Sequence, residues 1–461
     1  MRVLLLNPPY VPEFMRSARW AAVSISGSNW YPIYLAYCTG LLEKYGHKTK
    51  LVDGPVDRLS HEDVFKIAKD FSPDITVLYI STVSLENDIE IGEKIKELTG
   101  SYIILVGPWC SIHPDETIKK SDKIDSLAIR EFDYTVLELT EGKTENEING
   151  LVWKNKGKVI HNPPRKPLTH EQIDDFPFVT DVYRRHLNIQ NYFQAPHLHP
   201  FVDLFTGRGC SWGKCTFCLW PHTISKGAPY RTGDINKTIE ELQFVKEELR
   251  FVKEVFIQDD TLPARRAREL STAIIEAGLD MKWSCYARSD GTYDLETLEL
   301  MKESGCRCLH VGYESSNQQI LKNVKKGTTP KTMEKFTEMT NKVGLVNHAD
   351  FIIGLPGETV ETIKATVKWS KTLKVDSYQF TVPKPYPETP LYGYLEENGY
   401  LKDGWANYPD LSADDIAKWT KWALRQTNMN PRYLLRMMRK PKEWKRLIRS
   451  ARYVVPNVVR G

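Results

Sequence analysis

The sequence has no long hydrophobic run. None of its 461 residues lies in a stretch approaching the roughly 18 consecutive apolar residues that a membrane-spanning helix needs. A secretory signal is also absent, because the apolar run of residues 2–6 is too short and ends at Asn7-Pro8-Pro9. No repeat of about 20 to 50 residues is visible, which excludes a solenoid. We expect a protein of the cytoplasm with two or three ordinary globular domains.

Cysteine is scarce, with eight in the chain, and three of them lie together as Cys210, Cys215 and Cys218. Their spacing is C-x4-C-x2-C, and no fourth cysteine lies nearby. Three thiolates can hold three irons of a [4Fe-4S] cluster and leave the fourth iron open for a ligand. A structural zinc site usually takes four ligands, and His222 is close enough in sequence to be the fourth. The spacing alone therefore leaves both metals open.

The other five cysteines carry less information. Cys38, Cys110 and Cys285 read as small hydrophobic residues of the core. Cys306 and Cys308 flank an arginine just before an expected strand, and they fit either core packing or a redox pair.

The net charge of +4 is unevenly spread, since residues 431–461 hold ten Lys or Arg residues and one acid. Leucine, methionine and tryptophan are interleaved with these cations, as in helices that lie on anionic membranes. The tail fits peripheral association with the inner face of a membrane, or a terminal helix that is solvated or docked on the more acidic body. Binding of nucleic acid is the least favoured interpretation.

Residues 1–150 alternate between short apolar runs and amphipathic helical patterns. Strands are expected at residues 2–6, 49–52, 75–79, 102–106 and 126–129, and helices, among others, at 34–45, 86–98 and 133–140. This alternation predicts a doubly wound parallel sheet of the Rossmann type, whose ligands bind at the carboxyl ends of the strands. The residues at those ends are Pro8, Pro9, Ser81, Thr82, Val83, Gly107, Pro108, Arg130 and Glu131.

Residues 151–200 have many prolines and weak periodicity, apart from a hairpin expected at 150–160, and we assign them to a linker. A second alternating series of six strand–helix units fills residues 201–385 and predicts a partial (β/α)6 barrel with its site at the strand carboxyl ends. Residues 386–461 form a C-terminal helical region that ends in the basic tail. The fold class expected is thus α/β throughout.

The cysteine loop and the strand ends that follow it resemble the radical S-adenosylmethionine (SAM) enzymes. Behind Cys210, Cys215 and Cys218 come four sequence stretches in order, which read Gln-Asp-Asp-Thr at 258–261, Tyr-Ala-Arg-Ser-Asp at 286–290, Gly-Tyr-Glu-Ser at 312–315 and Ile-Gly-Leu-Pro-Gly-Glu at 353–358. Each stretch alone is a weak signal, and together they are specific. The resemblance identifies the metal as a [4Fe-4S] cluster rather than zinc.

The resemblance also implies the roles of individual residues. SAM would bind the open iron through its amino and carboxylate groups, and one electron would cleave its C–S bond to give a 5′-deoxyadenosyl radical. The residues that the resemblance places along SAM are Phe217, Asp259, Arg288, Glu314, Ser315 and Gly354. Asp259 and Asp260 could instead bind substrate.

Residues 1–150 resemble the cobalamin-binding domain that precedes many radical SAM domains. The strand-end residues from Pro8 to Glu131 given above would then contact cobalamin. The Asp-x-His-x-x-Gly motif that supplies a histidine below the cobalt in other cobalamin proteins is absent. A Rossmann-like domain without the cofactor is the alternative.

One subgroup resembles the chain over nearly its whole length, namely the radical SAM proteins of hopanoid biosynthesis that form a cyclitol ether. The shared stretches include Phe-Pro-Phe-Val-Thr-Asp-Val-Tyr at 176–183, the Cys-Thr-Phe-Cys-Leu-Trp-Pro run at 215–221 and Lys-Lys-Gly at 325–327. This subgroup remodels a sugar-like head group on a lipid. The extra residue in the cysteine loop and Gln258, where an acid is usual, depart from its pattern.

We therefore expect an oxygen-sensitive radical SAM enzyme that remodels a lipid head group or a sugar-like substrate. The alternative is cobalamin-dependent methylation of carbon, and a remote one is a non-catalytic cobalamin or cluster sensor. The expected partners are a small-molecule or lipid-linked substrate and a reductant of the flavodoxin or ferredoxin type. We also expect the extra residue of the loop to bulge outward at Gly213 without moving the thiolates.

Overall fold

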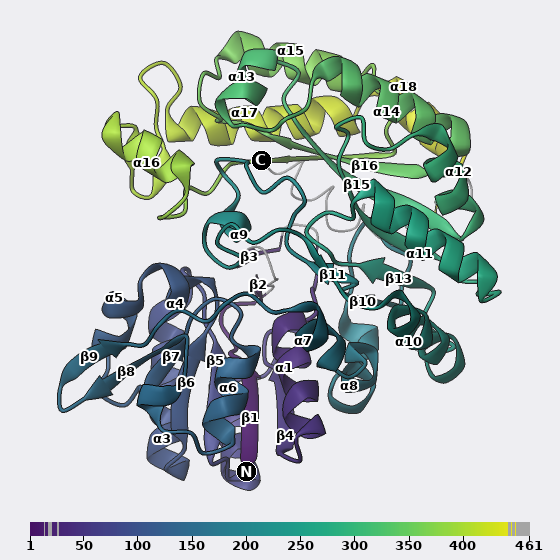
Figure 1. Ribbon diagram of the computed structural model, residues 1–461. Coiled ribbons are helices and arrows are strands. Elements are labelled where there is room, and N and C mark those ends of the chain that lie inside the picture. The colour runs from purple at the N-terminus through teal and green to yellow at the C-terminus, as the bar shows by residue number, and fades with distance from the viewer. Residues whose placement is uncertain (13, 17–20, 25–26, 441–443, 445–447, 449–461) are drawn as a thin grey trace. The chain divides into compact units, whose positions relative to one another are not determined.

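A computed structural model describes residues 1–12, 14–16, 21–24, 27–440, 444 and 448 of the chain. It divides into two compact units (Figure 1). The first comprises residues 1–194, 202–204 and 223–234, and the second comprises 195–201, 205–222 and 235–461. Within the described part, no helix is long and apolar enough to cross a membrane.

The first unit is built on a seven-stranded sheet in the order β4-β1-β5-β6-β7-β8-β9. The strands β4, β1, β5, β6 and β7 are parallel, and β8 and β9 add an antiparallel hairpin at one edge. Their bounds are β1 Arg2–Asn7, β4 Lys48–Asp53, β5 Ile75–Tyr79, β6 Tyr102–Val106, β7 Ser126–Ala128, β8 Leu151–Asn155 and β9 Lys158–His161. The first part of the region assigned to a linker is thus a sheet hairpin.

Helices cover both faces of this sheet. Leu4 and Leu6 pack into a core with α2 and α3, whereas α1 packs beside α6 and α8. The helical segments of this unit are α1 Ile33–Lys44, α2 His61–Phe71, α3 Leu85–Thr99, α4 Pro108–Ile112, α5 Pro114–Lys119, α6 Asp133–Thr140, α7 His170–Asp175 and α8 Val179–His186, with 3-10 turns at Glu145–Glu147 and Ile189–Asn191. A short hairpin joins β2 Phe14–Arg16 to β3 Ala21–Val23. The doubly wound α/β architecture expected from the sequence is confirmed.

The second unit is built on a six-stranded sheet in the order β10-β13-β14-β15-β16-β17, in which β13 to β17 are parallel. The bounds are β10 Phe201–Leu204, β13 Glu254–Ile257, β14 Trp283–Ala287, β15 Cys306–Glu314, β16 Val346–Ile352 and β17 Ser377–Thr381. Helices α11, α12, α14 and α15 follow its outer face in Figure 1. The partial barrel is confirmed.

The helices of the second unit begin and end where local chemistry predicts. Thr329 caps α14 by accepting a hydrogen bond from the Thr332 N–H, and Gly344 ends it with a φ of 78° that glycine adopts without strain. The helices are α9 Leu219–His222, α10 Ile235–Glu248, α11 Ala264–Glu276, α12 Leu295–Glu303, α13 Gln318–Asn323, α14 Pro330–Val343, α15 Val360–Ser370, α16 Pro390–Glu397, α17 Ala413–Asn428 and α18 Pro431–Met438. Four two-residue strands complete the element list, β11 Gly207–Arg208, β12 Arg231–Thr232, β18 Leu401–Lys402 and β19 Trp405–Ala406.

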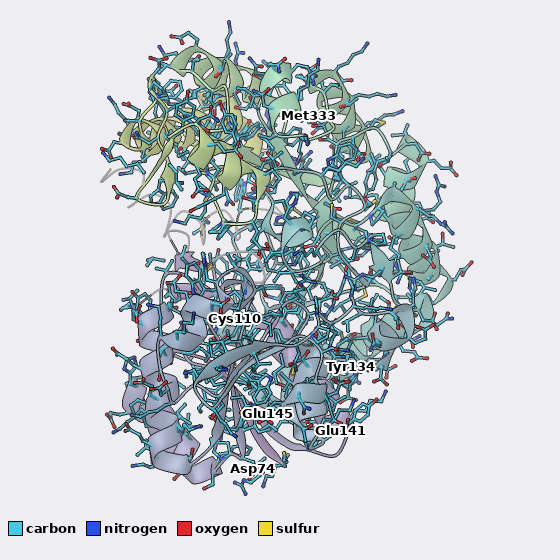
Figure 2. The ribbon with its side chains drawn as sticks, turned by 60° about the vertical axis from the view of Figure 1, so that its left-hand side comes forward. Asp74, Cys110, Tyr134, Glu141, Glu145 and Met333 are labelled. Carbon is cyan, nitrogen blue, oxygen red and sulfur yellow. The ribbon has the colours of Figure 1, made fainter. Side chains whose placement is uncertain are left out.

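The five cysteines outside the loop belong to the core. Cys38, Cys110 and Cys285 are fully buried, and burial raises the pKa of the Cys110 thiol (labelled in Figure 2). Cys306 and Cys308 are buried on β15 and are not joined to each other by a disulfide. Core packing is therefore their role.

Of the basic tail, residues 431–440, 444 and 448 lie in the described part of the chain. Tyr433 donates its hydroxyl to the Asp376 carbonyl at 3.1 Å, and Lys440 forms an ion pair with the Asp376 carboxylate. These contacts dock α18 on the start of β17. Residues 441–443, 445–447 and 449–461 lie outside the described residues, so membrane association of the tail stays a prediction.

Candidate active site

The three-cysteine loop follows β10 and is fastened to two later segments of the second unit. The Thr216 N–H donates to the Val324 carbonyl at 3.0 Å, just after α13, and the Thr216 carbonyl accepts from the Leu391 N–H at 3.0 Å, in α16. Cys215 is buried, whereas Cys210 and Cys218 are half-buried. Backbone bonds on both sides of Thr216 thus fix the loop between two helix ends.

Two cations partly offset the effect of burial on Cys215, whose pKa is raised on balance. Burial raises the pKa of this thiol, but the cations Lys326 and Arg288 act in the opposite direction. Thiolate is the form that binds iron, so these cations help to prepare the loop for a cluster. The three cysteines in one loop therefore fit a [4Fe-4S] cluster.

His222 does not behave as a fourth ligand. Its Nε2 atom lies 3.1 Å from the Cys215 carbonyl oxygen, so this nitrogen contacts backbone rather than the sulfur atoms. Over the residues that the structure describes, no three His, Cys, Asp or Glu side chains, the loop cysteines included, are grouped to hold a single metal ion, whereas the cysteines of a [4Fe-4S] cluster each bind a different iron. The contact of His222 removes the specific argument for zinc.

The extra residue of the loop does not simply bulge outward. Gly213 takes a φ of 60°, and Ser211 and Lys214 are exposed, as expected. Trp212, however, donates its indole N–H to the Lys325 carbonyl at 2.8 Å. A Cβ atom on Gly327 would lie 2.2 Å from the Trp212 ring, so the ring covers a place that only glycine leaves open. The longer loop therefore contains a tryptophan whose indole N–H attaches the loop to the segment after α13.

Behind this tryptophan lies a buried ion pair. Lys326 Nζ and Glu314 Oε1 are 2.6 Å apart, and both side chains are less than a tenth exposed. Burial alone would lower the pKa of Lys326, but Glu314 and the Cys215 thiol outweigh it and raise that pKa. A Cβ atom on Gly312 would lie 2.5 Å from Glu314 Oε1 and 2.9 Å from Lys326 Nζ, which explains the glycine there.

Arg288 joins the same group of side chains. Its guanidinium donates to the Lys326 carbonyl at 2.6 Å, pairs with Asp290 at 3.0 Å, and lies 5.1 Å from the centre of the Trp212 ring. The sequence analysis identified Arg288 and Glu314 as site residues, whereas it named Lys326 only within the shared Lys-Lys-Gly stretch at 325–327 and gave it no role.

Asp259 accepts hydrogen bonds from the chain just after β10. Its carboxylate accepts from the Thr206 N–H and hydroxyl, both at 2.7 Å, and from the Gly207 N–H at 3.2 Å. It is fully buried, so its oxygens hold the chain that leads into the cysteine loop. These hydrogen bonds give Asp259 a structural role, and its contact with SAM stays a prediction.

Ser315 is likewise engaged in packing, because its fully buried hydroxyl lies 3.3 Å from the Thr366 hydroxyl and accepts from the Asn317 N–H. Gly354 has a φ of 100°, and a Cβ atom there would lie 2.9 Å from Ile416 of α17. The absence of a side chain at Gly354 thus makes room for the side chain of Ile416. Phe217 packs against a small core that contains Leu355, next to Gly354.

In the first unit, buried charges lie where strands β1, β4 and β5 end. Arg16 donates to Asn7 at 3.0 Å and to Ser84 at 2.8 Å, and it forms an ion pair with Asp88 at 2.5 Å. Burial raises the pKa of Asp88 to about 6 and that of Asp53, which accepts from Asn7, to about 7. Asn7 lies at a strand end named from the sequence, whereas Arg16, Asp53 and Asp88 were not identified there.

The residues expected to meet cobalamin fall into two groups. Thr82 and Val83 are exposed after β5, so this edge offers an apolar side chain to a flat ligand. Gly107 after β6 is buried with a φ of 117°, and a Cβ atom on it would lie 2.8 Å from the Ile80 carbonyl oxygen. The other group is engaged in internal hydrogen bonds. Ser81 bonds to the Ser84 hydroxyl, the Pro8 carbonyl accepts from Arg16, and the Pro9 carbonyl accepts from Asn87.

Beyond β6 and β7, Pro108 begins α4 and Arg130 donates its N–H to Ser111 at 2.7 Å. Glu131 departs from the expectation, because it pairs through both carboxylate oxygens with Arg231 at 2.9 Å and is buried. It holds this unit together instead of facing an open edge.

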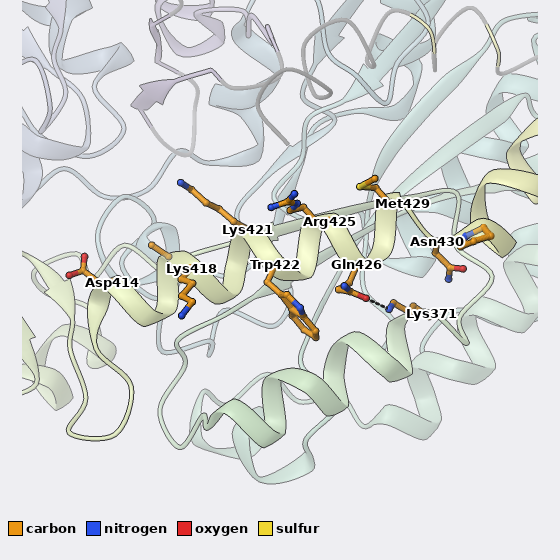
Figure 3. A pocket seen from close by; sticks show the side chains of 11 residues that line it. Lys371, Asp414, Lys418, Lys421, Trp422, Arg425, Gln426, Met429 and Asn430 are labelled. Carbon is orange, nitrogen blue, oxygen red and sulfur yellow. Dashed lines mark hydrogen bonds between the residues drawn. The ribbon is translucent and has the colours of Figure 1, made fainter. Parts of the chain in front are cut away.

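Apart from these sites, a groove of about 920 Å³ runs along α17 (Figure 3). Lys371 donates to Gln426 at 3.0 Å across it. The remaining lining side chains include the cations Lys418, Lys421 and Arg425. None of the residues identified from the sequence lies in it.

Family comparisons agree with the two-unit architecture. The family description "Radical SAM superfamily" matches residues 204–370, and "B12 binding domain" matches residues 19–140. The chain is 30% identical over 453 residues to an uncharacterized methyltransferase of Pyrococcus horikoshii, covering 95% of this chain and 94% of that one. It is 24% identical to the cytidylyl-2-hydroxyethylphosphonate methyltransferase of Streptomyces wedmorensis, covering 84% of each.

The fold is similar to a solved structure of the radical SAM methyltransferase TsrM from Kitasatospora setae with cobalamin and a [4Fe-4S] cluster bound. The TM-score is 0.69 at 19% identity, and the match covers 92% of this chain and 81% of that one. These relatives carry methyltransferase names, so the expected kinship with hopanoid-forming proteins is not supported.

Proposed function

The chain belongs to the radical SAM superfamily, in the group with an N-terminal B12-binding domain, and we propose that it transfers a methyl group from SAM to a small organic substrate. Its cofactors are a [4Fe-4S] cluster, SAM and cobalamin. The observation that carries the proposal is the 30% identity, over 95% of the chain, to a protein named as a methyltransferase. Methyl transfer thus replaces head-group remodelling as the main hypothesis.

The chain supplies the placement of these groups. Cys210, Cys215 and Cys218 would hold the cluster, which when bound supplies the electron that cleaves SAM. Arg288 and Lys326 bring two buried cations to the side of Cys215, where the carboxylate of SAM would need a partner. Glu314 balances Lys326 until SAM binds. The edge around Thr82, Val83 and Gly107 would hold cobalamin, which when bound carries the methyl group.

A substrate-free experiment tests the methyl-transfer step. Protein reconstituted anaerobically with iron, sulfide, cobalamin and a reductant is given SAM with a labelled methyl group. We expect S-adenosylhomocysteine in an amount close to that of the bound cobalamin, and none when cobalamin is omitted. Formation of 5′-deoxyadenosine alone, with the label retained on methionine, would contradict the proposal and favour a radical rearrangement.

A further inference from the structure

Cationic side chains, some buried and some exposed, are concentrated around the cysteine loop. Residues 208–222 contain Arg208 and Lys214, residues 318–331 contain four lysines, and neither segment contains an Asp or Glu. The two segments touch, because Thr216 bonds to Val324 and Trp212 bonds to Lys325. Positive charge from two distant parts of the sequence therefore gathers beside the three cysteines.

Three of these lysines point to solvent around the anchored tryptophan. Lys214, Lys322 and Lys325 are exposed, and Trp212 is half-buried between them. Lys214 Nζ lies 5.1 Å from the centre of the Trp212 ring, and the Lys325 N–H donates to the Lys322 carbonyl at 3.0 Å. We name these four residues the loop patch.

Two residues of the loop patch, Trp212 and Lys214, lie between the expected iron ligands in the sequence. Lys214 immediately precedes Cys215, and Cys210 and Cys218 are themselves half-buried rather than sealed. An electron that enters at this surface has a short route to the thiolates. Cleavage of SAM in the proposed reaction consumes one electron, which has to come from another molecule.

We propose that the loop patch is the docking surface for an acidic one-electron donor protein of the flavodoxin or ferredoxin class. The inference rests on the proposed function. In the encounter the donor is oxidised by one electron, and that electron would cleave the C–S bond of SAM to methionine and a 5′-deoxyadenosyl radical, which takes a hydrogen atom from the substrate. Exposed lysines around an aromatic side chain suit such a contact, since charge steers the encounter and the ring supplies apolar area.

The charge complementarity has a measurable consequence. Exposed charges are screened over about 8 Å at physiological salt, so added salt should weaken this docking. A contact made mainly by apolar area would respond little. Salt dependence therefore separates an electrostatic docking surface from non-specific adhesion.

The test compares two variants with the same change of charge. Lys322→Glu/Lys325→Glu reverses the charge of two lysines of the loop patch and leaves the residues of the cysteine loop unchanged. Lys418→Glu/Lys421→Glu reverses the charge of two lysines that line the groove on α17 (Figure 3). Binding of oxidised flavodoxin to each reconstituted protein is measured at low and high salt. We expect the Kd to rise about tenfold or more in the first variant only, as for close interfacial charges.

Kinetics provides the second measurement. With flavodoxin as reductant, Lys322→Glu/Lys325→Glu should raise the KM for flavodoxin while kcat stays the same. With dithionite, a small reductant that needs no docking, its rate of SAM cleavage should equal that of the wild type. If dithionite fails to drive SAM cleavage even in the wild type, the proposed function fails while the binding result still stands.

Several outcomes would overturn the docking proposal. Equal binding and equal KM in both variants would do so, and so would a defect confined to the α17 variant. A third such outcome is that the loop-patch variant Lys322→Glu/Lys325→Glu loses iron or its rate of SAM cleavage with dithionite, while Lys322→Gln/Lys325→Gln binds flavodoxin normally. The two lysines would then have a structural role only. Binding of anionic vesicles or DNA through the loop patch, without flavodoxin binding, would also reject it.

Discussion

Glu314 and Lys326 show how single residues constrain one another around the site. The pair is buried, Gly312 leaves room for both charges, and Glu314 takes a φ of 61° that is unfavourable for a residue with a side chain. Arg288 holds the turn by bonding to the Lys326 carbonyl. A pair that several neighbours position in this way is expected to be sensitive to loss of either charge.

Lys326→Met is predicted to destabilise the protein by about 3–5 kcal/mol, because it leaves the Glu314 carboxylate buried without its partner. Urea unfolding at neutral pH measures the change. The double variant Glu314→Gln/Lys326→Met removes both charges and should recover a large part of the loss. If the double variant is as unstable as the single one, the cost comes from packing rather than from an unpaired charge.

Gly327→Ala is predicted to displace Trp212. A Cβ atom there would overlap the indole ring, and Gly327 has a φ of 72°. Gly344→Ala is a matched control, since Gly344 has a φ of 78° but no atom within 4 Å of its Cβ position. The Gly327 variant should lose about 1–3 kcal/mol more than the control in urea unfolding, as overpacking usually costs. Equal losses would mean that the Trp212 ring gives way freely.

At the scale of elements, the turn between β16 and α15 carries a buried carboxylate. Glu358 accepts from the Gly354 N–H at 2.7 Å, and burial raises its pKa to about 7. The folded protein therefore keeps this proton at a pH where the unfolded chain, with a pKa near 4.3, has released it. Ionisation of Glu358 opposes folding, so its contribution to stability falls as the pH rises from about 4 towards 7.

Glu358→Gln is predicted to remove this pH dependence. The amide oxygen can still accept the Gly354 N–H, and no charge has to be buried. The free energy of unfolding of the wild type, compared with that of the variant, should therefore decline from about pH 4 to 7 and level off above that. Parallel curves for the two proteins would show that Glu358 does not titrate in this range.

The same turn shows why the helices of the second unit matter for the site. Gly354 is covered by Ile416 of α17, and its carbonyl accepts from the Tyr408 hydroxyl at 3.0 Å. The C-terminal helical region is thus attached to the strand end where SAM is expected. The residues that make these contacts, Tyr408 and Ile416, precede the basic tail.

At the scale of the whole molecule, the two units should respond to different cofactors. Cobalamin is expected to bind the first unit at the ends of β5 and β6, and SAM with the cluster to bind the second. A ligand at 100 times its Kd stabilises the state that it binds by about 2.7 kcal/mol. Each cofactor should therefore protect mainly its own unit from unfolding.

Hydrogen exchange on the cofactor-free protein tests this division. Adding hydroxocobalamin is expected to slow exchange in residues 75–83 and 102–112 and to leave residues 306–314 unchanged. Residues 306–314 serve as the internal control in the same sample. Protection confined to the second unit, or no protection, would contradict the assignment of cobalamin to the first.

The two sheets, the cysteine loop and the strand ends around it could all be predicted from the sequence. These features are local: strands and helices follow the period of apolar residues, and the loop and strand-end motifs are short runs of neighbouring residues. Fold class, cofactors and superfamily could therefore be predicted, whereas the substrate class inferred from the hopanoid resemblance was not supported.

The tertiary structure alone decided which side chains are engaged and which are open. Asp259 and Glu131 looked like ligands at strand ends, yet their oxygens bond to residues 53 and 100 positions away in sequence. Trp212 finds its anchor 113 positions away, at Lys325, and Lys326 reaches Glu314 only because the chain turns back there. Such pairings depend on how distant segments pack, and no periodicity or local spacing encodes them.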